Sequence, residues 1–195
     1  MKKVFIFLMM AISGACTYFE VAEIDPATGY IKANREATII TSKDIELDEF
    51  KSLLLISDSE FLKEQVQAID YFDELMTHAD LEKGIIRNNL QEKVPTVRDQ
   101  IGLNKAYKNY RKFLSFEYDS RGTGTEKYSQ FKLVNPGTLE DIFVAEIKLD
   151  AMVGINDQYT CYPLFNALIR YIKNHSKSYR DQMAEKKSVA VLGKD

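Results

Sequence analysis

Residues 52–77 read SLLLISDSEFLKEQVQAIDYFDELMT, and the order of elements within them decides the predicted fold. The run at 53–56 has strand length and is apolar on both faces, as in a strand at the middle of a sheet. A helix is predicted over residues 59–68, and residues 71–77 follow as a second strand. Strand, helix and strand in this order indicate a βαβ crossover unit.

Two helices near this unit have recognisable starts. Ser57 and Glu60 have the spacing of a capping box for the first helix. Its apolar positions recur at helical intervals, at Leu62, Val66 and Ile69. Thr77 or Asp80 is expected to open a second helix after the unit. Its buried side is predicted at Leu81, Ile85, Ile86 and Leu90.

The rest of the chain adds a third helix, three strands and a closing helix. An apolar stripe over residues 101–110 predicts the third helix. Apolar and polar residues then alternate, as in strands, at 114–118, 129–133 and 143–149. The last helix is predicted over residues 162–174. The expected fold class is therefore α/β (α+β): a single mixed sheet with a βαβ-like first half, an antiparallel three-stranded meander and a closing carboxy-terminal helix.

The length of 195 residues, with 45% hydrophobic and 28% charged residues, is sufficient for one folded domain. Pro26 and Gly29 indicate a turn between two moderately β-prone runs. After Ser176 the hydrophobic periodicity ends. We predict a signal peptide at 1–15, a lipid-anchor tether or amino-terminal hairpin at 16–36, the α/β domain at 37–176 and a flexible tail at 177–195.

The amino terminus carries the most specific motif in the chain. Lys2 and Lys3 form a positive region before the uncharged run VFIFLMMAI at residues 4–12. Small residues follow, and this order is typical of a signal peptide. Nine residues at ~1.5 Å each cover roughly half of a bilayer core, so a permanent membrane span is not expected here.

The segment ISGAC at residues 12–16 resembles the bacterial lipobox, in which the cysteine after the cleavage site becomes linked to diacylglycerol. The motif usually has Leu where this chain has Ser13. The resemblance implies lipidation of Cys16 and a membrane partner bound through that lipid. By analogy with enterobacterial sorting, Thr17 at the next position implies an outer-membrane lipoprotein that faces the periplasm.

Ordinary signal peptidase would cut at the same bond, because Ser13 and Ala15 satisfy its small-residue rule. The alternative product is a soluble secreted or periplasmic protein. Its free Cys16 would be expected to pair with Cys161 in an oxidising compartment. The formal charge of −3 disfavours non-specific binding to nucleic acid, so no nucleic-acid partner is expected.

The leader, the α/β unit, the meander and the closing helix together resemble small lipoproteins of Gram-negative envelopes. The domain is similar in outline to the amino-terminal domain of TolB and to curli-type secretion lipoproteins. The stretch YFDEL at residues 71–75 is a local detail of this resemblance. The resemblance implies an adaptor or assembly role with another envelope protein, and it implies no catalytic motif or cofactor.

Candidate catalytic groups have simpler structural explanations. Cys161 with His78 or His175 would make a nucleophile and base pair, but no family-type signature surrounds the cysteine. The carboxylates considered for acid and base chemistry or a hard metal are Asp70, Asp73, Glu74, Asp150 and Asp157. Their spacing matches no metal loop, so solvated or capping roles are favoured and no metal is expected.

The loop before the last helix is the predicted partner site, because it mixes polar and aromatic residues as recognition loops do. The residues that we single out are Asn156, Asp157, Tyr159 and Tyr162. The structural alternative is a capped helix start with Tyr162 packed inward. Our leading hypothesis is a non-enzymatic envelope lipoprotein that binds another protein. The alternative from another class is a soluble secreted or periplasmic hydrolase that uses strand-end carboxylates.

Overall fold

A six-stranded mixed sheet in the order β1-β6-β5-β4-β2-β3 forms the centre of the structure. The computed structural model describes residues 20–149 and 157–192, with side chains described to residue 188. The strands of the sheet are β1 (Thr38–Ser42), β2 (Ser52–Leu55), β3 (Glu74–Met76), β4 (Leu114–Arg121), β5 (Tyr128–Asn135) and β6 (Glu140–Lys148). The architecture confirms the α/β fold class.

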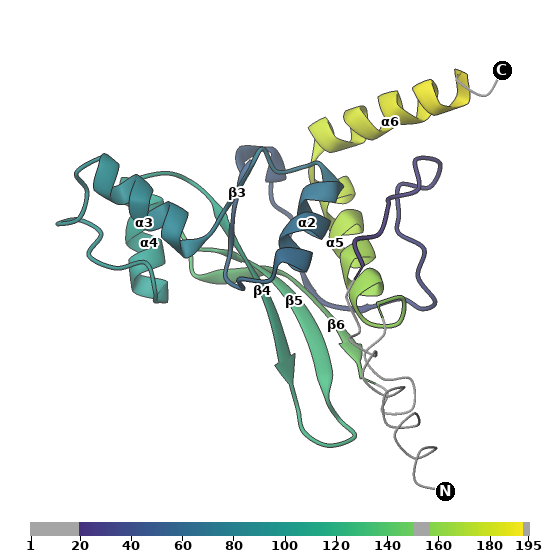
Figure 1. The fold of residues 1–195 in the computed structure, drawn as a ribbon, viewed down its shortest axis with the longest axis horizontal. Coiled ribbons are helices and arrows are strands. Elements are labelled where there is room, and N and C mark those ends of the chain that lie inside the picture. The colour runs from purple at the N-terminus through teal and green to yellow at the C-terminus, as the bar shows by residue number, and fades with distance from the viewer. Residues whose placement is uncertain (1–19, 150–156, 193–195) are drawn as a thin grey trace, which may run out of the picture.

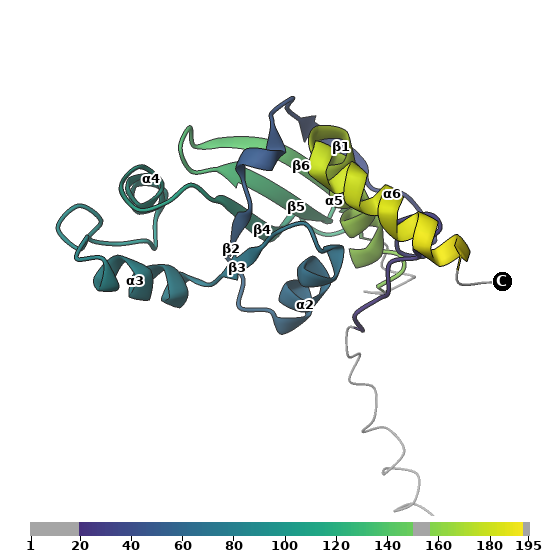
Figure 2. The same ribbon diagram turned by 90° about the horizontal axis from the view of Figure 1, so that it is seen from above.

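The helices surround the sheet unevenly. They are η1 (Leu47–Glu49), α2 (Glu60–Ile69), α3 (His78–Arg87), α4 (Gln100–Asn109), α5 (Cys161–His175) and α6 (Lys177–Leu192). Figure 1 shows α3 and α4 together at one end of the molecule, and α6 extending at the other end. Viewed from above, α2 lies beside the sheet between these two ends (Figure 2).

Strand β2 is an interior strand next to the edge strand β3, and both of its faces are covered, as its doubly apolar sequence predicts. It pairs in parallel with β3 on one side and with β4 on the other. Leu53 and Leu55 belong to the core that α2 and α5 cover, whereas Leu54 belongs to a second core built with α3 and α4. All three leucines are buried, which explains why both faces of this strand are apolar.

The second half follows the predicted meander. Strands β4 and β5 pair antiparallel, as do β5 and β6. Strand β1 pairs antiparallel with β6 and has a register shift between Ile39 and Thr41, so Ile40 is the extra residue of a β-bulge. The predicted closing helix is confirmed as α5, whose long apolar side is buried.

The helix starts differ in one detail from the prediction. Ser59, not Ser57, caps α2, because its side chain accepts from the backbone N–H of Leu62. The Ser57 hydroxyl instead accepts from the backbone N–H of Ser59. Thr77 and Asp80 form the full capping box of α3, so that prediction is confirmed.

The sequence predicts a flexible tail from residue 177, and the residues that the structure describes there are helical. They form helix α6, whose first turn is fixed to the domain. Tyr179 is buried, and its ring packs edge-on against Tyr71 with 5.8 Å between centroids. Beyond this turn the described side chains are mostly exposed, so α6 shows no long apolar stripe. Periodicity therefore could not reveal it.

Asp48 holds the start of α6. Its carboxylate accepts from the backbone N–H groups of Lys177 and Ser178, each at 3.0 Å. Burial opposes ionisation of this carboxyl, but hydrogen bonds from Ser176 and Ser178 outweigh that effect and hold the pKa of Asp48 well below its usual value. A carboxylate at this point also complements the helix dipole.

Candidate functional site

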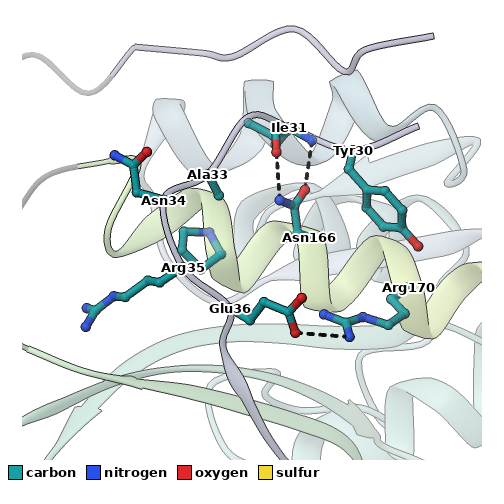
Figure 3. Close-up of a pocket in the computed structure, with 9 residues that line it drawn as sticks. Tyr30, Ile31, Ala33, Asn34, Arg35, Glu36, Asn166 and Arg170 are labelled. Carbon is teal, nitrogen blue, oxygen red and sulfur yellow. Dashed lines mark hydrogen bonds and ion pairs between the residues drawn. The ribbon is translucent and has the colours of Figure 1, made fainter. Parts of the chain in front are cut away.

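Residues 20–37, here called the N-terminal segment, contain no strand, yet side-chain amides hold the segment against the domain. Gln65 of α2 accepts from the backbone N–H of Ala22 at 2.7 Å and donates to its carbonyl at 3.0 Å. Asn166 of α5 accepts from the N–H of Ile31 at 2.8 Å and donates to its carbonyl at 2.7 Å (Figure 3). Each amide satisfies both backbone groups of one residue, as a neighbouring strand would.

The predicted turn around Pro26 is present within this segment. The backbone N–H of Gly29 donates to the carbonyl of Asp25 at 2.6 Å, and Gly29 has a positive φ of 70°. The backbone N–H of Asp25 donates to the carbonyl of Tyr30 at 3.0 Å across this turn, but neither side of the turn forms a strand. Further out, Gln65 of α2 and Asn166 of α5 bind the backbone groups of Ala22 and Ile31. The segment that the sequence presents as a tether or hairpin therefore packs on the domain from residue 20 onward.

Residues 157–162, which are the loop before α5 together with the first two residues of that helix and are here called the loop before α5, fix the start of the segment. The Asp157 carboxylate accepts from the backbone N–H of Glu20 at 3.1 Å, and the Tyr162 hydroxyl donates to the carbonyl of Glu20 at 2.8 Å. The guanidinium of Arg35 donates to the carbonyl of Tyr159 at 2.5 Å. Three of the four predicted site residues therefore meet the N-terminal segment, and Asn156 lies outside the described residues.

The two tyrosines of this loop differ. Tyr162 is buried and packs inward, which agrees with the structural alternative for that residue. Tyr159 is half-buried and keeps part of its side chain at the surface. Of the two, only Tyr159 is therefore placed to contact a partner without unfolding the loop.

Asp157 does not cap α5 with its side chain. Its backbone carbonyl accepts from the N–H of Tyr162 at 2.8 Å and closes the turn. Its carboxylate accepts from the backbone N–H of Glu20 instead of capping the helix. The cap position belongs to Thr160, whose side chain makes no capping hydrogen bond. Burial raises the pKa of Asp157, and the hydrogen bond from Glu20 partly offsets this effect.

A cleft of about 460 Å³ lies between residues 30–36 and the first half of α5. Its walls are the N-terminal segment on one side and Pro163, Asn166 and Arg170 on the other. The Arg170 guanidinium lies 3.6 Å from the Glu36 carboxylate (Figure 3). Arg35 points away from Arg170 in this view and also donates to the carbonyl of Lys148 at 2.7 Å. The cleft thus offers polar and charged groups rather than a closed apolar cavity.

The thiol and the imidazoles do not form a nucleophile and base pair. Cys161 is almost completely buried, and burial raises the pKa of its thiol to about 12. His175 lies 14 residues further along the same helix, which corresponds to ~21 Å of helix rise. His78 begins α3, on the other side of the sheet. The thiol is therefore protonated at neutral pH and lacks an adjacent base.

Two of the strand-end carboxylates form ion pairs, and a third, Asp73, is exposed. Asp70 lies 2.7 Å from the ammonium of Lys186, and Glu74 forms an ion pair with Arg111. Asp150 lies outside the described residues. Within residues 20–149 and 157–192, no cluster of three His, Cys, Asp or Glu side chains is arranged to hold a metal ion.

Comparisons with models of known families, with curated proteins and with solved structures found no match to this chain. In the part of the chain that the structure describes, no helix is both long and apolar enough to cross a membrane. The assignment of a function therefore depends on the leader sequence and on the geometry of the N-terminal segment.

Proposed function

We propose that the protein is an outer-membrane lipoprotein, anchored by lipid on Cys16, that faces the periplasm and binds another envelope protein through its α/β domain. The leader supports the anchor, since a cysteine follows a short apolar run and small residues. The resemblance to TolB-like and curli-type lipoproteins remains a prediction. It is consistent with an adaptor role.

The contacts of Glu20 are the observation that carries the proposal. Both of its backbone groups are bonded to the loop before α5, through Asp157 and Tyr162. Cys16 precedes Glu20 by four residues, a length of chain that spans at most ~14 Å. A lipid on Cys16 would therefore hold this loop, with the neighbouring cleft, close to the membrane surface.

The same geometry favours protein binding over the hydrolase alternative. The carbonyl of Tyr159, a half-buried aromatic residue, accepts from Arg35, which lines a polar cleft. An aromatic residue near polar groups is a combination found at protein interfaces. Three of the carboxylates that a hydrolase would use, Asp70, Glu74 and Asp157, are instead bound to Lys186, Arg111 and Glu20. A partner reached through this loop would itself be near or in the outer membrane.

The anchor is tested by Cys16→Ser and by inhibition of the lipoprotein peptidase. We expect the substitution to move the protein from the membrane fraction to the soluble fraction, and inhibition to block maturation of the wild type. Cys161→Ser serves as the matched control and should leave fractionation unchanged. Normal processing together with a Cys16–Cys161 disulfide would contradict the proposal and favour the secreted form.

The partner surface is tested with a photo-crosslinking phenylalanine analogue at position 159, in intact envelopes. We expect one discrete product at this position, identified by mass spectrometry. The same analogue at position 101, an exposed isoleucine on α4, is the matched control and should not give that product. Equal labelling from both positions would contradict a specific site at the loop.

A further inference from the structure

Apart from the bulge at Ile40, the outer edge of β1 lacks the usual protections of a sheet edge. The strand lies at the end of the sheet and, among the described strands, pairs only with β6. Its sequence TIITS holds no charge and no proline, and Ile39 and Ile40 are 40% and 53% exposed. The opposite edge, β3, has only three residues, and its Glu74 is ion-paired with Arg111. Shortness and charge are the usual protections of sheet edges, and β1 has neither.

The bulge at Ile40 interrupts the alternation of side chains along β1, so that residues at both ends of the strand share a face of the sheet. Thr38 pairs with Glu146 and Thr41 pairs with Val144. Because Glu146 and Val144 are two residues apart on β6, Thr38 and Thr41 point to the same face of the sheet. The strand therefore presents threonine side chains on one face at both of its ends.

We propose that β1 pairs antiparallel with β1 of a second copy of this chain, and that this pairing joins two sheets across a two-fold axis. In the register that we infer, Thr38 of each copy lies opposite Thr41 of the other. Ile39 then lies opposite Ile40 of the second copy. Every contact occurs twice, as a two-fold interface requires.

The charges that flank the strand select this register. In it, Glu36 lies opposite Lys43 of the second copy, and their side chains are 81% and 42% exposed. A shift by one residue would instead place Glu36 opposite Asp44, whose side chain is fully exposed. Opposite charges facing each other across strands stabilise a pair and like charges destabilise it. In the inferred register, β-branched residues therefore face each other within the strands, and opposite charges face each other at the strand ends.

The existing ion pairs of these residues do not prevent the contact. Glu36 lies 3.6 Å from Arg170, and Lys43 lies 3.0 Å from Glu140. All four side chains are largely exposed, and exposed ion pairs contribute little and exchange readily. The inference is independent of the proposed anchor, because it rests on β1 and on the flanking residues Glu36 and Lys43.

The register is tested by cysteine crosslinking of the full chain in its own membranes. We expect Thr38→Cys combined with Thr41→Cys to give a disulfide-linked dimer on a non-reducing gel after mild oxidation. Either single substitution should give little, because the same residue in two copies is then too far apart for a disulfide. The wild type under the same oxidation controls for Cys16 and Cys161. No dimer from the double variant, or equal dimer from the single variants, would overturn the proposal.

Further substitutions in the double-cysteine chain test the contacts. Ile40→Lys should reduce the crosslinked dimer at least tenfold, whereas Ile101→Lys, at a 68% exposed isoleucine on α4, should leave it unchanged. Glu36→Lys alone should weaken crosslinking, and its combination with Lys43→Glu should restore it. Unchanged thermal melts of the purified variants confirm that they are folded. Full crosslinking in the Ile40→Lys chain would overturn the pairing.

Discussion

The N-terminal segment and helix α6 show that regular structure and attachment are separate properties. The segment, residues 20–37, has no helix or strand, but contacts to Gln65, Asn166 and the loop before α5 hold it along its length. Helix α6 has 16 residues of regular structure, but its described side chains beyond the first two turns are exposed. An irregular segment can therefore be more firmly fixed than a helix, because tertiary contacts supply its hydrogen bonds.

The largest effect that sharpens this comparison is expected from Ile31→Ala. Ile31 is buried in the main core although it belongs to no helix or strand. Truncation should lower the free energy of unfolding by ~2–5 kcal/mol, the range for large-to-small core changes. Urea denaturation of wild type and variant measures it. Ile101→Ala is the control, and a similarly small loss for both would mean that the segment is not part of the core.

A smaller loss is expected from Gln65→Ala, which removes the amide that holds Ala22. Gln65 is fully buried, and its removal leaves two backbone groups without partners. Such unsatisfied groups cost ~1–3 kcal/mol. Amide hydrogen exchange should also become faster at Ala22 and remain unchanged at Ile31. If hydrogen exchange became equally faster at Ala22 and at Ile31, the side-chain amides of Gln65 and Asn166 would not hold the segment independently of each other.

Asp48→Ala should destabilise the start of α6 by ~0.5–2 kcal/mol at pH 7, the usual cost of losing a helix cap. The pKa of Asp48 is lowered in the folded protein, so the ionised carboxylate favours folding. This contribution is complete above about pH 5 and decreases as the pH falls below ~4. Urea melts at pH 7 and pH 3 should therefore show a smaller difference between wild type and variant at pH 3. An equal difference at both values would contradict a role for the charge.

The smallest effect is expected from ending the chain after Ala184. The described side chains that this truncation removes, Glu185 to Ser188, are exposed, so stability should change by less than ~0.5 kcal/mol. Ending the chain before Tyr179 should instead remove the ring that packs on Tyr71, leave Tyr71 uncovered and lower the melting temperature clearly. If both truncations behave alike, α6 is not held by its first turn.

The sequence predicts those parts of the fold that depend on local patterns. Leu53 to Leu55 mark the central strand because burial on both faces leaves a continuous apolar run. Thr77 and Asp80 mark the start of α3 because a capping box is local. Alternation marks the meander in the same way.

The rest depends on contacts between distant residues. Gln65 lies among the buried apolar positions of α2, and this polar residue in an apolar stripe is the one signal for the contact with Ala22. Nothing near Asp48 in the sequence indicates a helix start at residue 177. The cleft joins residues 30–36 to Asn166 and Arg170, which are over 120 positions away. Local periodicity therefore could not place it.

The contacts of the N-terminal segment also set how the domain would respond to mechanical force on its amino-terminal side. A pull applied there loads Glu20 first, then Ala22, and only afterwards Ile31, because their bonds to the loop, to Gln65 and to Asn166 follow one another along the chain. Bonds that are loaded one at a time resist with the strength of a single contact, not with their sum. The start of the segment would therefore peel from the domain at low force, up to the point where Ile31 enters the core and resists further extension.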